Sequence, residues 1–380
     1  MYLDMAATMP VRAEVLRAIG PLLAEPLGNP SSRHSAGDRA RGILDEARAT
    51  VASVVGARPH DVVFTSGGTE SDHLGVAGMA LARPRGRRVL VSAVEHPAVL
   101  EAAEQLAERH GFTVTILPVD RVGRVRLDVL AAELRPDVAV CSIMAANNEV
   151  GTVQPLAEIG RLCAAAGVPW HCDAVQAAGR LDLGAEALPA AALSISGHKL
   201  GGLVGTGALI VRRGTRLAPM LPGGGHQDGR RSGTENVVGA VALATALVLA
   251  ENERRRERAG TQPPLAARRD AFLAALLAAV PGAELTGHPV ERLPGHLSLI
   301  VPGVNGETML LDLDRAGISC SSGSACAAGS QEPSAVLTAM GVPAERAHTA
   351  LRLSFGAELD EAGMRRVADT LGGIVRRLRG

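Results

Sequence analysis

The stretch "DVAVCSIMAANNEVGTVQPLAEIGRLCAAAGVPWHCDAV" (137–175) reads as a strand, a helix and a second strand. Residues 137–144 and 168–172 are short, mainly apolar runs, and the first carries the β-branched residues Val138, Val140 and Ile143. The segment between them, 155–167, has a helical pattern of apolar residues. Apolar strands that alternate with helices are typical of a parallel sheet covered on both faces.

The same alternation extends over residues 60–213 and predicts the main part of the fold. Further strand-like runs lie at 61–65, 88–92, 113–119, 192–196 and 207–213, which brings the expected number of strands to seven. A helical pattern at 100–111 separates two of them. We therefore expect an α/β domain with a large, mainly parallel sheet, in which binding residues lie where strands end.

A change of composition near residue 252 predicts a second, smaller domain. The run "ENERRRERAGTQPP" (251–264) is charged and then broken by proline, as at a connecting helix or a domain edge. Strand patterns at 295–304, 318–322 and 351–356 follow, with helical patterns between them. The last helix carries Met364, Val367, Leu371, Ile374 and Leu378 on one face. We predict an α+β domain at 256–380, a large domain at 15–255, and an N-terminal segment, 1–14, that packs with the small domain.

Composition limits the classes of partner. The 380 residues have a formal net charge of zero, which argues against a bulk electrostatic partner such as nucleic acid or an acidic membrane surface. Five cysteines, with no signal-peptide pattern at "MYLDMAATMP", predict a reducing, cytoplasmic setting without structural disulfides. The longest apolar run, 237–250, is too short to span a bilayer and is better interpreted as a buried helix.

Several segments carry residues suited to chemistry. Lys199 follows a buried-looking strand in a chain that has very few lysines, because nearly all its positive charge is arginine. Arginine cannot form an imine at neutral pH, so a lysine in this glycine-rich loop fits a Schiff-base role, although it could also be a surface residue. Asp173 ends another strand and could hold a pyridinium nitrogen protonated or could only cap the next helix. The segment "SGGT" (66–69) between a strand and a helix suits a phosphate, or is an ordinary N-cap.

Three other segments complete the set. His96 begins a helix and could stack on a planar ring, move a proton or only cap the helix. Asn147 and Asn148 follow a strand, where their amides could bind a carboxylate or only fix a turn. Arg352, among apolar neighbours, is expected to pair with a carboxylate of the protein or of a substrate. Together these residues suit pyridoxal phosphate acting on an amino acid.

The sequence resembles the cysteine desulfurases, pyridoxal-phosphate enzymes with the class V aminotransferase fold. The resemblance covers nearly the whole chain. It rests on the blocks "GNPSSRH" (28–34), "FTSGGTES" (64–71), "EHPAVL" (95–100), "NNEVGT" (147–152), "HCDAVQ" (171–176), "SISGHK" (194–199), "GGGHQDGRRSGTEN" (223–236), "SSGSAC" (321–326), "EPSAVL" (332–337) and "LRLSFG" (351–356). It departs after Lys199, where "HKLGGLVGTG" lacks the second lysine and the proline usual in the family, and at Met5 and His73.

The resemblance implies a role for each site residue. Lys199 would bind the cofactor as a Schiff base, Asp173 would pair with the pyridinium nitrogen and Gln176 with the ring oxygen. His96 would stack on the ring and assist proton transfer. Asn147 and Arg352 would hold the substrate carboxylate. The phosphate would be held by Gly68, Thr69, Ser196 and His198, and by Thr234 from the partner subunit of a homodimer.

The resemblance also separates the two cysteines of "AGISCSSGSACAAG" (316–329). Cys326 would accept sulfur from L-cysteine as a persulfide and deliver it to an acceptor protein, for iron–sulfur cluster assembly, tRNA thiolation or another product. Cys320 lies in the strand pattern and is interpreted as a small core residue. An aminotransferase or lyase of the same fold is the alternative, and it needs no thiol at position 326. No metal site is expected, because no second cysteine pair has ligand spacing.

Overall fold

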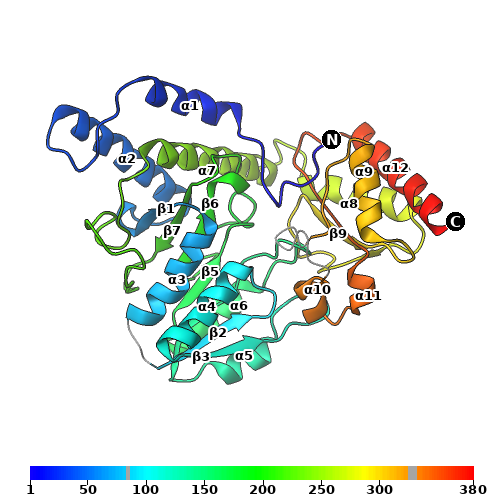
Figure 1. Cartoon of the computed structure of the whole chain (residues 1–380), viewed down its shortest axis with the longest axis horizontal. Coiled ribbons are helices and arrows are strands. Elements are labelled where there is room, and N and C mark those ends of the chain that lie inside the picture. Colours follow the sequence, from blue (N-terminus) through cyan, green and yellow to red (C-terminus); the bar gives the residue numbers. More distant parts are fainter. Residues whose placement is uncertain (83–85, 324–331) are drawn as a thin grey trace.

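The computed structural model describes residues 1–82, 86–323 and 332–380. Its larger part is built on a seven-stranded sheet with the strand order β1-β7-β6-β5-β4-β2-β3 (Figure 1). Four neighbouring pairs, from β6 to β3, run parallel, and β7 is antiparallel to both β1 and β6. The predicted α/β class and mainly parallel sheet are therefore confirmed. The strands are β1 (Val62–Thr65), β2 (Arg88–Ser92), β3 (Thr113–Leu117), β4 (Val138–Ser142), β5 (Trp170–Asp173), β6 (Ala192–Ser196) and β7 (Gly207–Val211).

Helices cover both faces of this sheet, as its apolar strands require. In β2 the side chain of Leu90 joins the core that α2, α6 and α7 build with one face, whereas Val89 and Val91 join the core of α3 and α4 on the other. This alternation follows from the two-residue period of a strand. The helices of this part are α1 (Ala13–Ala24), α2 (Ser35–Val54), α3 (Gly68–Ala82), α4 (Pro97–His110), α5 (Leu127–Glu133), α6 (Leu156–Ala166) and α7 (Val237–Arg258).

The 14-residue apolar run lies in α7, where its side chains are mostly buried in the protein core. Within the described ranges, no helix has the length and apolar content needed to cross a membrane. The predicted boundary at 255/256 falls within the last turn of α7. The predicted boundary therefore cuts through α7. The division into domains stays a prediction.

The C-terminal part has its own sheet and its own hydrophobic core. The sheet is antiparallel with the order β10-β9-β8, formed by β8 (Glu284–Leu285), β9 (His296–Ile300) and β10 (Ala350–Ser354). In its core, Phe272 and Phe355 pack edge to face, with ring centroids 5.5 Å apart. The predicted apolar face of the last helix is packed against this core. The helices are α8 (Leu265–Ala279), α9 (Gly306–Arg315), α10 (Ala335–Ala339), α11 (Ala344–Ala347) and α12 (Glu361–Arg379).

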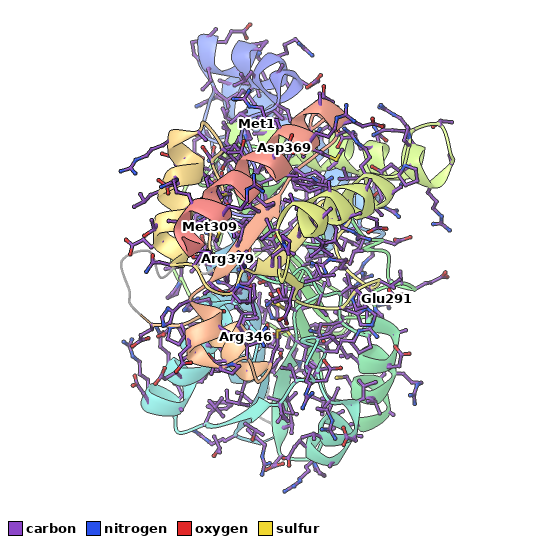
Figure 2. The ribbon with its side chains drawn as sticks, turned by 90° about the vertical axis from the view of Figure 1, so that its right-hand side faces the viewer. Met1, Glu291, Met309, Arg346, Asp369 and Arg379 are labelled. Carbon is purple, nitrogen blue, oxygen red and sulfur yellow. The ribbon has the colours of Figure 1, made fainter. Side chains whose placement is uncertain are left out.

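The N-terminal segment pairs with this smaller part. Tyr2 bridges Ser319 and Asp4 bridges Ser354, both in parallel. Figure 2 shows Met1 beside α12. Residues 318–322, expected to form a strand, form isolated bridges instead. Ser319 pairs with Tyr2 on one side, and Ser321 pairs with Arg352 on the other. The pairing carries residues 4–9 to the edge of the main sheet.

Candidate active site

A cavity of about 330 Å³ lies where the strands of the main sheet end. Asp173 is the last residue of β5, and Ser196 is the last residue of β6. Lys199 ends a short 3-10 helix directly after β6. Nine of the residues expected from the sequence line this cavity: Gly68, Thr69, His96, Asp173, Gln176, Ser196, His198, Lys199 and Arg352.

One end of the cavity is a cradle at the N-terminus of α3. Gly68 and Thr69 open this helix, so their backbone N–H groups and the helix dipole favour an anion there. A Cβ atom at Gly68 would lie 3.0 Å from Val175 and 3.5 Å from Ser196, so a larger residue would narrow the cradle. Burial and the nearby Lys199 lower the pKa of His198 to about 4, which leaves its ring neutral at neutral pH.

A buried carboxyl group faces the cavity from the end of β5. Asp173 accepts a hydrogen bond from the backbone N–H of Val175 at 2.8 Å. Burial raises the pKa of Asp173, while the positive charges of His96 in its protonated form and of Lys199 lower it. These groups therefore oppose the cost of burying the charge, and the carboxylate can pair with a protonated ring nitrogen.

Lys199 is the only lysine in the chain. Its ammonium group donates hydrogen bonds to the carbonyl oxygens of Ala6 at 2.5 Å and Ala7 at 2.7 Å. The side-chain amide of Gln176 donates to Ala6 as well, at 2.9 Å. The N-terminal segment is thus one wall of the site, which sequence analysis did not foresee.

His96 is both the cap of α4 and a residue of the cavity wall. Its Nδ1 atom accepts a hydrogen bond from the backbone N–H of Ala98 at 3.1 Å. A neutral ring that accepts at Nδ1 carries its proton on Nε2. Capping of α4 and a role of His96 in the cavity, which the sequence left as alternatives, are therefore compatible.

Arg352 enters the cavity from β10 with its side chain almost fully buried. Its Nη1 donates to the carbonyl oxygens of Asn148 at 3.0 Å and Gly323 at 3.1 Å, and its Nη2 donates to the Asp4 carboxylate at 2.6 Å. The Nε–H is buried and has no hydrogen-bond partner among the described residues. A buried guanidinium group beside a cavity fits the carboxylate of a ligand.

Asn147 does not line the cavity. Its side chain is buried, donates to the carbonyl oxygen of Val94 at 2.9 Å and accepts from the backbone N–H groups of Glu149 and Val150. These bonds fix the turn after β4, the second alternative that the sequence left open. The cavity is lined instead by Asn148, so contact of Asn147 with a substrate stays a prediction.

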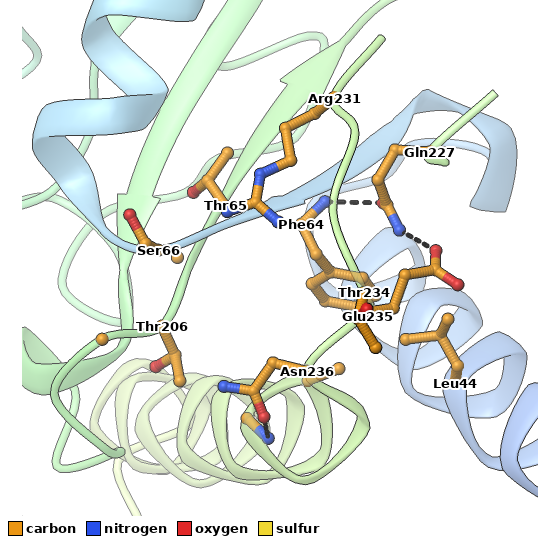
Figure 3. A pocket seen from close by; sticks show the side chains of 14 residues that line it. Leu44, Phe64, Thr65, Ser66, Thr206, Gln227, Arg231, Thr234, Glu235 and Asn236 are labelled. Atoms are coloured by element: carbon orange, nitrogen blue, oxygen red, sulfur yellow. Dashed lines mark hydrogen bonds between the residues drawn. The ribbon is translucent and has the colours of Figure 1, made fainter. Parts of the chain in front are cut away.

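Thr234 lies in a different pocket, of about 160 Å³, between α2, α7 and the ends of β1 and β7 (Figure 3). The loop that carries it is anchored by Gln227, whose side chain accepts from the backbone N–H of Phe64 at 2.8 Å and donates to Glu235. Arg231 in the same loop forms a two-bond ion pair with Glu70 at 2.7 and 3.1 Å. The structure therefore holds Thr234 on the surface of the main domain, outside the cavity of its own chain.

The two cysteines of the segment 316–329 are Cys320 and Cys326. Cys326 lies outside the described residues. Cys320 packs against the core of the smaller part, and burial raises the pKa of its thiol to about 12. The interpretation of Cys320 as a core residue is confirmed. A thiol with this pKa is almost fully protonated at neutral pH and is a weak nucleophile.

A buried polar network behind the cavity was missed by the sequence analysis. Asp72 lines the cavity, and its buried Oδ1 lies 3.7 Å from Nε2 of His171 and has no hydrogen-bond partner among the described residues. The ring of His171 bonds the hydroxyls of Ser142 at 2.8 Å and Ser194 at 2.9 Å. Burial raises the pKa of Asp72 well above its usual range, and the Asp173 charge adds to this effect. Asp72 directly follows the block 64–71, and His171 is two residues before Asp173. Only the fold places the two side chains together.

The described residues fit pyridoxal phosphate. The cavity brings together an amine, a buried carboxyl group, a histidine and a helix N-terminus, which match the aldehyde, ring nitrogen, ring face and phosphate of that cofactor. The cradle that a Gly68 side chain would narrow also indicates space for a polar ligand.

The comparisons agree with this geometry. The class-V aminotransferase family matches residues 1–367. A cysteine desulfurase IscS of Dictyoglomus turgidum is 40% identical over 382 aligned positions, which cover 100% of this chain and 95% of the relative. A solved NifS-like protein superposes with a TM-score of 0.90 at 32% identity over 100% of both chains. SspA, solved in complex with cysteine, gives 0.81 at 30% identity over 93% of this chain and 98% of its own. The chain therefore belongs to the class-V aminotransferase family. Within that family it groups with the cysteine desulfurases.

Proposed function

We propose that the protein is a pyridoxal-phosphate-dependent cysteine desulfurase that converts L-cysteine to L-alanine and retains the sulfur as a persulfide. The observation that carries this proposal is that Lys199, Asp173 and Arg352 meet around one cavity. They supply an amine for a Schiff base, a counterion for a ring nitrogen and a clamp for an amino-acid carboxylate. The relatives that are cysteine desulfurases, and SspA with its bound cysteine, support cysteine as the substrate.

The cofactor, when bound, would supply an electron sink for the bonds broken at the substrate. Lys199 would hold it covalently, and Asp173 would keep its ring nitrogen protonated. Gly68, Thr69, Ser196 and His198 would bind its phosphate, and Gln176 would donate to the ring oxygen. His96 would cover one face of the ring.

Substrate would be oriented by Arg352 and deprotonated by Lys199. The guanidinium group of Arg352, which lines the cavity, would bind the substrate carboxylate. Lys199 would take the proton from Cα of the substrate, with His96 as the second acid–base group. The same groups would return the proton to the carbon skeleton to form alanine.

Cys326 would accept the sulfur. Its thiolate would attack the sulfur atom of bound cysteine, so that a sulfur–sulfur bond forms as the carbon–sulfur bond breaks. The net reaction is one cysteine and one enzyme thiol giving one alanine and one enzyme persulfide, which is balanced in atoms and electrons. A cytoplasmic acceptor protein would then receive the sulfur.

We also propose a homodimer in which Thr234 reaches the cofactor phosphate of the partner subunit. Support comes from apolar side chains left uncovered near its loop: Val204 is 79% exposed and Leu221 is 50% exposed. Val204 adjoins Gly205, which lines the Thr234 pocket, and the carbonyl of Leu221 accepts from Ser232. Uncovered apolar groups of this kind are common at subunit interfaces. Sedimentation equilibrium of the holoenzyme would give the mass of two chains.

The experiment for this function supplies cofactor, L-cysteine and a reductant to the purified protein and measures alanine and sulfide. A desulfurase yields the two in equal amounts. An aminotransferase would yield a keto acid without alanine, and a lyase would yield sulfide without requiring Cys326. Cys326→Ser should abolish persulfide formation while the cofactor stays bound.

A further inference from the structure

Asp4 is the charged partner of Arg352. Its Oδ1 accepts from Nη2 of Arg352 at 2.6 Å, and the Arg352 side chain is only 2% exposed. The other bonds of the guanidinium go to the neutral carbonyl oxygens of Asn148 and Gly323. Within the described ranges, Asp4 is thus the carboxylate that offsets the buried charge of Arg352.

The position of Asp4 is fixed by the pairing of the N-terminal segment with β10. The backbone N–H of Ser354 donates to Leu3 at 2.8 Å, and Met5 donates back to Ser354 at 3.2 Å. The backbone N–H of Ala6 donates to the hydroxyl of Ser354 at 2.8 Å. These bonds flank Asp4 on both sides, so its carboxylate is held beside Arg352 rather than placed there by chance.

The other titratable groups around Arg352 do not replace Asp4. Glu149 is close enough for its pKa to respond to Arg352, but burial raises that pKa, and its carboxyl group bonds the hydroxyl of Ser334 at 2.6 Å. Burial lowers the pKa of His296 to about 3, so this ring is neutral. The net charge around the guanidinium group of Arg352 is therefore set mainly by Arg352 itself and by Asp4.

We propose, resting on the function proposed above, that Asp4 is a positioning residue that sets the affinity of the site for the substrate carboxylate. Asp4 pairs with Nη2 of Arg352, whose side chain lines the cavity. An incoming carboxylate then shares one guanidinium with Asp4, and the two negative charges repel each other at short range in a partly buried site. Binding of the carboxylate is weakened, which favours release of alanine.

The test measures dissociation constants of the holoenzyme for L-alanine and for ethylamine, from the change that each causes in the visible absorbance of the cofactor. Ethylamine has the amine of alanine but no carboxylate. Asp4→Asn keeps a hydrogen-bond acceptor and removes the charge, so it should tighten binding of L-alanine by about threefold or more. Binding of ethylamine should stay within about twofold of the wild type. Asp4→Glu, which restores the charge, should bring L-alanine back towards the wild-type value.

The proposal would be overturned if Asp4→Asn left L-alanine binding unchanged or weakened it, or if ethylamine shifted by the same factor. Should Asp4→Asn fail to fold, Asp4→Ser gives a second neutral acceptor with the same two expected results. The measurement does not depend on desulfuration: a wild-type protein that makes no alanine from cysteine contradicts the proposed function, whereas the alanine and ethylamine constants still decide the role of Asp4.

Discussion

The ammonium group of Lys199 donates a hydrogen bond to the carbonyl oxygen of Ala6 at 2.5 Å. The two residues are 193 positions apart, and they meet because the N-terminal segment pairs with Ser354 of β10 and then crosses to the end of β6. The wall of the site that faces Lys199 is therefore built partly of backbone, whose carbonyl oxygens orient the amine.

The first prediction concerns Lys199 itself. Borohydride reduction of the holoenzyme should fix the cofactor to a single side chain, because Lys199 is the only lysine. Peptide mass spectrometry should find the added mass on Lys199 alone. Lys199→Ala should lose the visible absorbance of the Schiff base, and Lys199→Arg should lose it too, since arginine keeps the charge but forms no imine. A reduced adduct on Lys199→Arg would contradict the assignment.

The second prediction concerns Asp173. Asp173→Asn keeps the size of the side chain but removes the charge that opposes loss of the ring proton, so turnover should fall by about 10²-fold or more. The absorbance maximum of the bound cofactor should shift as well, which a purely structural role would not cause. Asp369→Asn, on the exposed face of α12, is the matched control and should change neither quantity. Full turnover by Asp173→Asn would refute the role of this carboxylate.

The third prediction is a loss of stability in mild acid. Burial lowers the pKa of His171 to about 3, so the folded protein keeps this ring neutral where an unfolded histidine, with a pKa near 6.5, takes up a proton. The unfolded state binds more protons between these values, and stability falls as the pH drops below about 6.5, by up to about 1.4 kcal/mol per unit. Denaturant unfolding at several pH values measures the slope.

His171→Gln should reduce that slope, because glutamine does not titrate. His110→Gln, at an exposed position, is the control and should leave the slope unchanged. An identical acid slope in wild type and His171→Gln would show that this residue is not the cause.

The fourth prediction concerns thiol reactivity. Cys141, Cys163 and Cys172 are buried, and Cys320 has a pKa raised to about 12 by burial. At pH 8 these four should react slowly with iodoacetamide in the folded protein, and rapidly in denaturant, where a cysteine pKa is near 8.5. Cys326 should be labelled first. Preferential labelling of Cys320 would contradict the assignment of Cys326 as the reactive thiol and of Cys320 as a core residue.

The parts of the site that the sequence predicts are those that follow strands. Asp173, Ser196, Lys199 and His96 come directly after apolar runs, and parallel strands bring such positions to one edge of a sheet. Whether Asn147 or its neighbour faces the cavity could not be decided, because adjacent residues in a turn differ by the direction of one side chain.

The contributions of Ala6, Asp4 and Asp72 could not be predicted for a different reason. Ala6 and Asp4 reach the site through pairing with a strand near residue 354, and a contact across such a distance leaves no local pattern. Asp72 lies on a helix with little amphipathic character, since α3 is buried on most of its surface. Its position opposite His171 follows only from how α3 packs on the sheet.

The most direct test of the account is mass spectrometry of the holoenzyme after one addition of L-cysteine without reductant, combined with measurement of alanine. The account predicts one added sulfur atom on the peptide that contains Cys326, with one alanine formed for each. It also predicts that Cys326→Ser gains no sulfur and that Cys320→Ser gains as much as the wild type. Sulfur on Cys320, or persulfide formed by Cys326→Ser, would contradict it.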